Sequence, residues 1–365
     1  MRLHLYFARK FAWIFGGLMM VFFLLQALID LIEQVRLLDD TEAGFSDMLG
    51  LTLLNAPFGL NRMLPLVMIL AAVALFLGLA RTSELVVVRA IGRSGLGALA
   101  APALVAALIG VLVVIMFNPI VAATSKRYEE LLQGFRSGGT DVLSISADGL
   151  WLRQGDPDGQ TVIRASSANP DATVLYNVTF IAYAPGGGAI KRIEAREAEI
   201  GQDAWQLRGA KVWPLGSGVN SEATATTHET LTLPTSLTRD RIRDSFGAPS
   251  AISIWDLPAY IAQLEQAGFS ARRHSVWLQM ELARPLFLVA MVLIGAAFTM
   301  RHTRFGGTGV AVLFSLLLGF GLYYIKNFAQ ILGENGQIPI ALAAWAPPLA
   351  ALMLGLGLLL HTEDG

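Results

Sequence analysis

The chain has 365 residues, of which 54% are hydrophobic and 15% charged, and its formal net charge is −1. A soluble domain usually carries about 25% charged residues, so this composition is typical of a membrane protein, and the balanced charge argues against a nucleic-acid partner. The absence of cysteine excludes disulfides, thiolate metal sites and a cysteine nucleophile.

Three segments in the first part of the chain are apolar enough to cross a bilayer. A helix needs about 20 mostly apolar residues to span about 30 Å of hydrocarbon. Residues 11–29, 63–80 and 94–125 carry no charge. The first segment is longer than the apolar region of a signal peptide and no small-residue cleavage site follows it, so we expect it to remain as a span.

A long polar insert follows, and its hydrophobic period changes from that of a helix to that of a strand. Residues 141–154, 160–168, 172–184 and 189–200 alternate apolar and polar side chains over much of their length. Turn signals rich in Pro, Gly, Asn and Asp separate them. We therefore predict an all-β domain of the sandwich or jellyroll type over residues 126–252.

The last part of the chain repeats the pattern of the first. Residues 253–268 read as an amphipathic helix, which either lies at the outer membrane boundary or packs on the β domain. Apolar segments at 276–300, 305–325 and 338–360 then predict three more spans. The expected domains are thus 1–125 with spans one to three, the 126–252 insert, and 253–365 with the amphipathic helix and spans four to six.

The positions of the basic residues predict the orientation, because cytoplasmic loops are enriched in Lys and Arg. One set of span ends carries Arg2, Arg9, Lys10, Arg81, Arg89, Arg93, Arg301 and Arg304. The opposite set carries Arg36, Arg62 and Lys326, with several acids nearby. We expect both termini and the loop around residues 81–93 in the cytoplasm, and the β domain outside.

That loop, between the second and third spans, contains a short helix over residues 83–92. Ser83 can cap it, and Glu84, Val87, Val88 and Ile91 fall on one arc at 100° per residue. A helix this short does not hold its own apolar face together in water. It therefore needs a surface to dock on, which is either lipid headgroups or a groove on a soluble partner.

The residues of this loop resemble those of a known family. The loop sequence "ARTSELVVVRAIGRS" resembles the coupling-helix segment of the lipopolysaccharide export permeases, the LptF/LptG (YjgP/YjgQ) family, and is more similar to its LptG branch. The resemblance continues through "EQVR", "APFGLNRMLPLVMILAAVALFLGLA", "NPIVAATSKRYEE", "GLWLR", "LPAYIAQLEQAG" and "RPLFLVAMVLIGAAF". The arrangement of three plus three spans around one outward β-jellyroll domain matches as well.

The resemblance implies a non-catalytic permease subunit of an ABC exporter in the bacterial inner membrane. It implies an LptF-like permease as heterodimer partner, an LptB-like ATPase dimer that binds ATP and Mg²⁺, an LptC-like membrane protein and an LptA-like periplasmic bridge. Lipopolysaccharide would be the substrate. This chain itself has no G-x-x-x-x-G-K-[ST] motif, so another chain must bind the nucleotide.

The resemblance also implies two sets of site residues. The expected ATPase-coupling residues are Ser83, Glu84, Leu85, Val87, Val88, Arg89, Ile91 and Gly92. Val87, Val88 and Ile91 would be buried in the ATPase, and Glu84 would pair with a basic group there. The expected substrate-binding residues are Asp30, Gln34, Arg36, Arg62, Lys126 and Arg127, of which the basic ones would meet lipid A phosphates at the outer headgroup level.

Other chemistry finds less support in the sequence. The five histidines are scattered, and the sequence has no H-E-x-x-H motif, so we expect no metal site. Glu281 and Arg284 lie inside a span, where charges are often functional, but their spacing also fits a local ion pair at the interface. A membrane scaffold whose outward β domain binds a partner, without transport, is the alternative function.

Overall fold

The computed structural model describes residues 2–39, 43–90, 95–136, 143–146, 149–156, 159–169, 173–184, 188–201, 204–215, 220–235, 248–266, 269–300 and 308–363. The chain divides into two compact units. The membrane unit comprises Met1–Phe135, Ser250–Trp255 and Arg272–Gly365, and the β unit comprises Arg136–Pro249 and Asp256–Ala271.

The membrane unit is helical, and the described residues contain six helical segments long and apolar enough to cross a membrane, which confirms the six predicted spans. The third span is continuous from α4 through one π-helical turn, η1, into α5. The elements are α1 (Arg2–Leu37), α2 (Phe45–Arg81), α3 (Glu84–Ala90), α4 (Gly95–Leu112), η1 (Val113–Phe117), α5 (Asn118–Arg136), η2 (Pro249–Ala251), α8 (Arg272–Thr299), α9 (Thr308–Glu334) and α10 (Ile340–Glu363).

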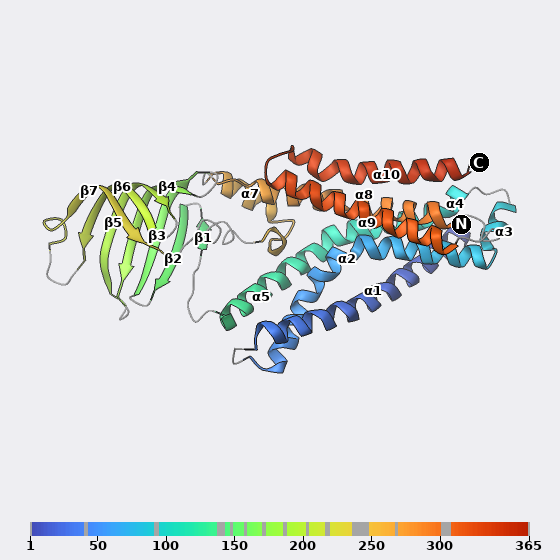
Figure 1. Ribbon diagram of the computed structural model, residues 1–365, viewed down its shortest axis with the longest axis horizontal. Helices are drawn as coiled ribbons and strands as arrows, with labels where there is room; N and C mark the ends of the chain where they lie inside the picture. Colours follow the sequence, from blue (N-terminus) through green and yellow to red (C-terminus); the bar gives the residue numbers. More distant parts are fainter. Residues whose placement is uncertain are drawn as a thin grey trace. The chain divides into compact units, whose positions relative to one another are not determined.

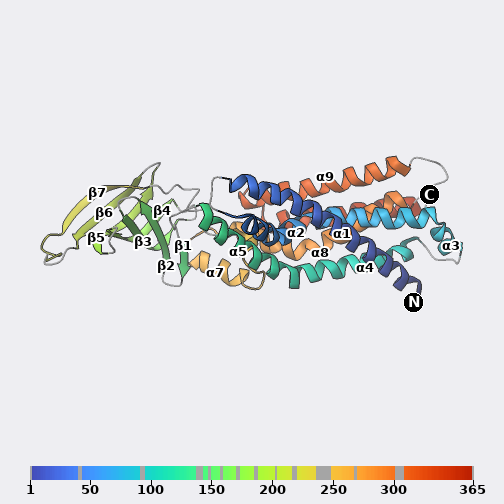
Figure 2. The same cartoon turned by 90° about the horizontal axis from the view of Figure 1, so that it is seen from below.

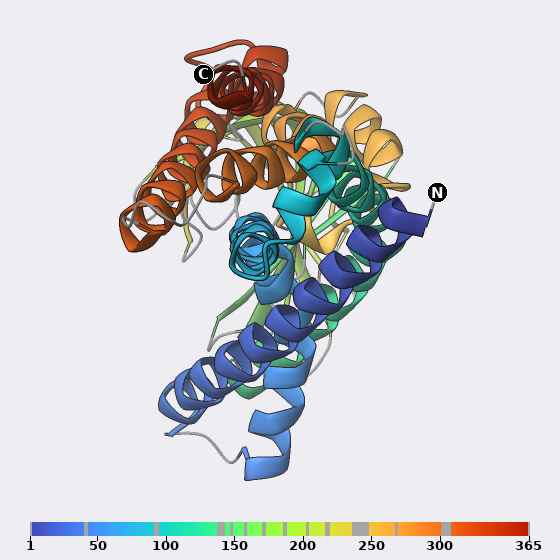
Figure 3. The same ribbon diagram turned by 90° about the vertical axis from the view of Figure 1, so that its right-hand side faces the viewer.

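Helices α2 and α8 form the centre of this unit, since they carry most of its buried side chains, whereas α1 and α9 expose long apolar faces. A Cβ on Gly295 would lie 2.8 Å from the Cβ of Ala72, so glycine is what lets α8 approach α2 this closely. Figure 3 shows α8 beside α9 and α10, with α1 crossing α2 on the other side. The two halves of the sequence thus pack into one bundle.

The π turn η1 has a structural role in the same unit. The carbonyl oxygen of Ile115 accepts a hydrogen bond from the indole N–H of Trp255 at 3.3 Å. The Asn118 side-chain oxygen accepts one from the backbone N–H of Ile254 at 2.8 Å. A π turn displaces carbonyls from the regular helical ladder, and here one of them receives an outside donor. The segment Ser250–Trp255 is thereby fixed to the third span.

The β unit contains one seven-stranded antiparallel sheet in which each strand pairs with its neighbours in sequence (Figure 1). Its core is the apolar face of the alternating strands, and Phe180 and Trp205 pack edge to face in it with ring centroids 6.1 Å apart. The predicted all-β insert is confirmed. The strands are β1 (Leu143–Ser146), β2 (Gly149–Asp156), β3 (Gly159–Ala168), β4 (Val174–Tyr183), β5 (Ala189–Ile200), β6 (Ala204–Pro214) and β7 (Thr226–Pro234).

The amphipathic helix α7 (Leu257–Gln266) belongs to this unit and contacts β1 (Figure 2). Leu264 is buried in the core of the sheet, with Tyr260 and Ile261 packed against it. Of the two sequence alternatives, packing on the β domain is therefore the one observed. The unit boundaries differ from the expected 126–252 and 253–365, because α5 continues the third span to Arg136 and the apolar stripe of α7 is buried on the sheet.

Candidate functional site

The loop helix α3 lies at one end of the membrane unit. Figures 1 and 2 agree that the beginning of α1, the end of α10 and α3 are at this same end. The sequence predicts that shared end from its basic residues. We call it the loop-helix end.

The two sides of α3 have different environments. Leu85 and Val88 are 5% and 4% exposed and belong to the core of the membrane unit, whereas Val86 and Val87 are 43% and 57% exposed. Residues three apart share a helix face, which is why Leu85 and Val88 are buried together. Leu85 and Val88, which were both expected to couple to the ATPase, pack within the chain in this structure, and their part in coupling stays a prediction. Val87 remains available to a partner.

Glu84 also finds its partner inside the chain. Its Oε1 lies 2.9 Å from the Nζ of Lys10 in α1 and accepts a 2.9 Å hydrogen bond from the hydroxyl of Thr82. Burial alone would raise the pKa of Glu84, but hydrogen bonds from Lys10, Thr82 and Tyr6 outweigh burial and hold the pKa below its usual value. In this structure the carboxylate joins α3 to the first span, and pairing of Glu84 with a basic group of the ATPase stays a prediction.

The remaining coupling residues lie at the ends of α3. Ser83 precedes the helix with φ of 59°, a left-handed conformation uncommon for serine, and its carbonyl accepts hydrogen bonds from the N–H groups of Val86 and Val87. Arg89 is in the helix, but its side chain is outside the described part of the structure. Ile91 and Gly92 lie outside the described residues altogether.

Two of the six expected substrate residues are buried and form hydrogen bonds between helices. Asp30 is 4% exposed and accepts hydrogen bonds from Gln26 at 3.0 Å and from Asn55 of α2 at 3.2 Å. Gln34 is 1% exposed and donates to the Tyr128 hydroxyl of α5 at 2.9 Å. These contacts hold α1 against α2 and α5, although the side-chain oxygen of Gln34 finds no hydrogen-bond partner among the described residues. Contact of Asp30 and Gln34 with the substrate stays a prediction.

The four basic residues of the set have different environments. Arg36, Lys126 and Arg127 are exposed, and Arg127 forms an ion pair of 3.2 Å with Glu130 one turn further along α5. Arg62 lines a cavity in the membrane unit, and the other residues of the set are not among the side chains that line it. Contact of Arg36, Lys126 and Arg127 with lipid stays a prediction.

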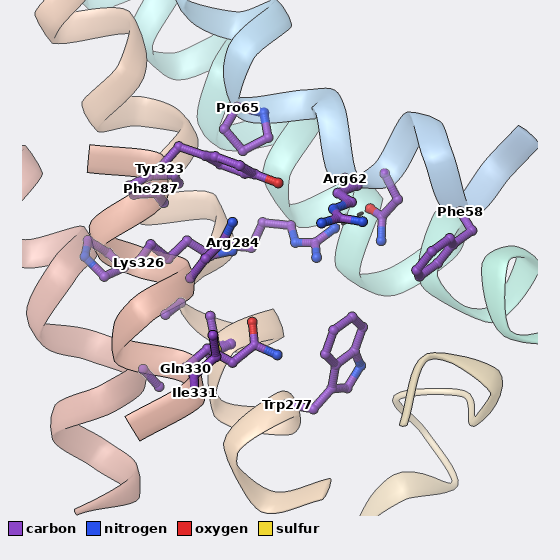
Figure 4. A pocket seen from close by; sticks show the side chains of 16 residues that line it. Phe58, Arg62, Pro65, Trp277, Arg284, Phe287, Tyr323, Lys326, Gln330 and Ile331 are labelled. Carbon is purple, nitrogen blue, oxygen red and sulfur yellow. Dashed lines mark hydrogen bonds between the residues drawn. The ribbon is translucent and has the colours of Figure 1, made fainter. Parts of the chain in front are cut away.

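That cavity has a volume of about 300 Å³ and lies among α2, α8, α9 and α10 (Figure 4). Arg62 of α2, Arg284 of α8 and Lys326 of α9 all line it. Arg284 hydrogen-bonds to the side-chain oxygen of Asn61 and forms an ion pair with Glu281, which confirms the predicted local ion pair. We call this space the cationic cavity.

Sequence reasoning missed Arg284 and Lys326 as members of one site. The sequence predicts Lys326 at the end of a span, whereas the structure has it inside α9. The sequence does contain a signal that relates Arg62, Arg284 and Lys326, namely the distance of each cation along its helix from the loop-helix end. At 1.5 Å per residue, Arg62 is about 28 Å from Arg81, Arg284 about 23 Å from Thr299, and Lys326 about 27 Å from Thr308. All three therefore reach a similar depth, near the opposite membrane boundary.

The fold and the cavity define a class: a multi-pass membrane protein of two three-span halves with a β domain inserted between them. Residues 5–361 match the model of the lipopolysaccharide export system permease LptF/LptG family. The chain belongs to this family. It is 24% identical to the LptG permease protein of Haemophilus influenzae over 351 residues, covering 93% of both chains. It is 26% identical to LptG of Escherichia coli K12 over 360 residues, covering 95% of this chain and 96% of that one.

Proposed function

We propose that the chain is the LptG-like, non-catalytic permease subunit of an ABC exporter that extracts lipopolysaccharide from the bacterial inner membrane. An LptF-like permease would pair with it, and an LptB-like ATPase dimer would bind ATP and Mg²⁺. LptC-like and LptA-like proteins would receive the lipid. In this arrangement both termini and α3 face the cytoplasm and the β unit faces the periplasm. Membership of the family supports the proposal.

The observation that carries the proposal is the two-sided environment of α3. One side, Leu85 and Val88, is packed in the membrane unit, and the other, Val86 and Val87, is exposed. Glu84 adds an ion pair to the first span. A short helix held in this way is fixed to the spans and still offers an apolar surface to a soluble protein. A force applied to Val86 and Val87 would therefore move α3 together with α1.

The test is co-purification of an ATPase with the tagged full chain, solubilised from its native membranes. Val87→Asp places a carboxylate on the exposed side of α3 without disturbing the buried side. We expect it to reduce the co-purified ATPase activity by at least about tenfold, because burial of an unpaired charge in an interface costs several kcal/mol. Ile190→Asp is the matched control, since Ile190 is 51% exposed in the β unit.

Equal ATPase recovery from Val87→Asp and wild type would overturn coupling through α3. Absence of any ATPase and of any second permease from the wild-type preparation would favour the scaffold function instead. Release of lipopolysaccharide from membranes that contain the same variants provides the second readout. It should fall in parallel with the recovered ATPase if both depend on one docking surface.

A further inference from the structure

Asp30 of α1 is a carboxyl group buried in a membrane span without a counter-ion. Its side chain is 4% exposed, and its two oxygens accept hydrogen bonds from neutral amides, from Gln26 at 3.0 Å and from Asn55 at 3.2 Å. Within the described ranges no Lys, Arg or His forms an ion pair with it, and the charged group that acts on it, Glu33, has the same sign. Neutral hydrogen bonds do not replace the hydration that a buried carboxylate loses, so an ionised Asp30 lacks compensation here.

A second unsatisfied group lies one turn further along α1. Gln34 is 1% exposed, and its side-chain N–H donates to the Tyr128 hydroxyl at 2.9 Å, whereas its Oε1 has no hydrogen-bond donor among the described residues. Residues four apart share one helix face, so the carboxyl of Asp30 and the Oε1 of Gln34 lie on the same side of α1. Buried acceptors are nearly always partnered, so the missing partner at this face is a donor or a cation.

The helices packed on α1 supply no cation to this face in the described structure. Helix α4 has no charged residue. Helix α2 contributes the neutral Asn55, and its nearest charged residues in sequence, Asp47 and Arg62, are about 12 Å and 10 Å away along the helix. Helix α5 contributes the hydroxyl of Tyr128. The charged residues beside Tyr128 in α5 form no bond with Asp30, and they are Lys126, Arg127, Glu129 and Glu130.

The burial of the two groups limits what can satisfy them. Asp30 and Gln34 are too enclosed for a side chain of another protein to reach them, and an anion would be repelled by Asp30 and Glu33. A divalent cation needs several anionic ligands, and in the described part of the chain no three His, Cys, Asp or Glu side chains come together as a metal-binding group. A small monovalent cation remains. A proton would join Asp30 to the Oε1 of Gln34, and Na⁺ would take oxygens of both as ligands.

We propose that Asp30 binds one small monovalent cation, H⁺ or Na⁺, together with the side-chain oxygen of Gln34. The bound cation neutralises the carboxyl group, so the hydrogen bonds to Asn55 and Tyr128 hold α1 against α2 and α5 without a buried charge. Loss of the cation places a negative charge at these contacts and loosens this part of α1. The attachment of the first span therefore depends on pH or on Na⁺, whatever the chain transports.

The test compares the unfolding equilibria of wild type and Asp30→Asn in the full chain, purified in detergent. Asparagine keeps the shape of the side chain and carries no charge, so the variant should not need a cation. If the cation is H⁺, wild type should lose stability relative to Asp30→Asn as the pH rises above about 4, because its folded state then holds one proton more than its unfolded state. The ratio of the two unfolding constants should change by up to tenfold per pH unit.

The Na⁺ arm uses sodium chloride against the same concentration of choline chloride at fixed pH. If the cation is Na⁺, sodium chloride should raise the melting temperature of wild type and not that of Asp30→Asn. Glu130→Gln is the matched control, because it removes an exposed carboxylate of α5 and should respond to pH and Na⁺ as wild type does. A difference between wild type and Asp30→Asn that changes with neither pH nor Na⁺ would overturn the proposal.

Amide hydrogen exchange of the wild-type chain is the second measurement and needs no variant. Loss of the cation should speed exchange in the α1 peptide that contains Asp30 and Gln34, relative to a peptide of α8 in the same sample, which corrects for the intrinsic effect of pH. An infrared band of a protonated carboxyl group that Asp30→Asn lacks would identify H⁺ as the cation. An exchange ratio that is constant over both the pH series and the Na⁺ series would contradict the proposal.

Discussion

The ion pair between Lys10 and Glu84 should stabilise α3 against the first span by a modest, measurable amount. The two side chains are each 30% exposed and their charged atoms are 2.9 Å apart. At this exposure solvent screening limits the pair to about 0.5–1 kcal/mol, which corresponds to about a two- to fivefold change in the opening equilibrium of α3. Glu84→Gln should increase local opening by that factor at pH 7, since it removes the charge and keeps a hydrogen-bonding side chain.

Amide hydrogen exchange of the peptide that covers Glu84–Ala90 measures this opening in the full chain. Lys10→Met, Glu84→Gln and the double variant form a cycle that isolates the interaction of the two side chains. Because the folded pKa of Glu84 is lowered, its contribution is present above the usual glutamate pKa and is lost as the pH falls through the folded value. The effect of Glu84→Gln should therefore disappear in acid. Strictly additive single effects at pH 7 would refute the reasoning.

Two further predictions concern packing. Val88→Ala should lower the free energy of unfolding by about 1.5–2.5 kcal/mol, because two buried methyl groups and their contacts are lost, whereas Val87→Ala should change it by less than about 0.5 kcal/mol. Thermal unfolding of the two variants measures the difference. Equal effects of the two substitutions would contradict the two-sided environment of α3. Gly110→Ala should lower the free energy of unfolding by about 1–3 kcal/mol, because the added Cβ would lie 2.6 Å from the backbone Cα of Pro285. Gly16→Ala is the control, because a Cβ added there meets nothing within 4 Å, and it should be neutral or mildly stabilising in the same assay.

The spans and the β insert were predictable because each depends on a local period of the sequence. Uncharged stretches such as residues 63–80 have no stable place except a bilayer or a core, and alternation over much of residues 189–200 predicts strand β5. The placement of α7 was not predictable, because its apolar stripe suits a lipid surface and a sheet equally well. Only the packing of Leu264 into the β unit decides between them.

The site residues were harder to predict because they depend on which helices are neighbours. The sequence places Glu84 on the apolar arc of a short helix, and pairing with a partner protein was a natural interpretation. The structure brings Lys10 to it across 74 positions in the chain. Likewise, Arg62, Arg284 and Lys326 belong to three different spans, and nothing local to any of them indicates the other two. Equal depth in the membrane reduces the number of residues that could share a site, but the contacts between α2, α8 and α9 determine which of them do.

The strictly sequential pairing of β1 to β7 has a consequence for biogenesis. Each strand meets its partner as soon as the next stretch of chain emerges, so the contacts of the sheet are short in sequence and close quickly. The helices α2 and α8, in contrast, are separated by the whole insert and pack only after both have been synthesised. We therefore expect the sheet to assemble before the last three spans have packed on the first three, with α7 completing the core of the sheet.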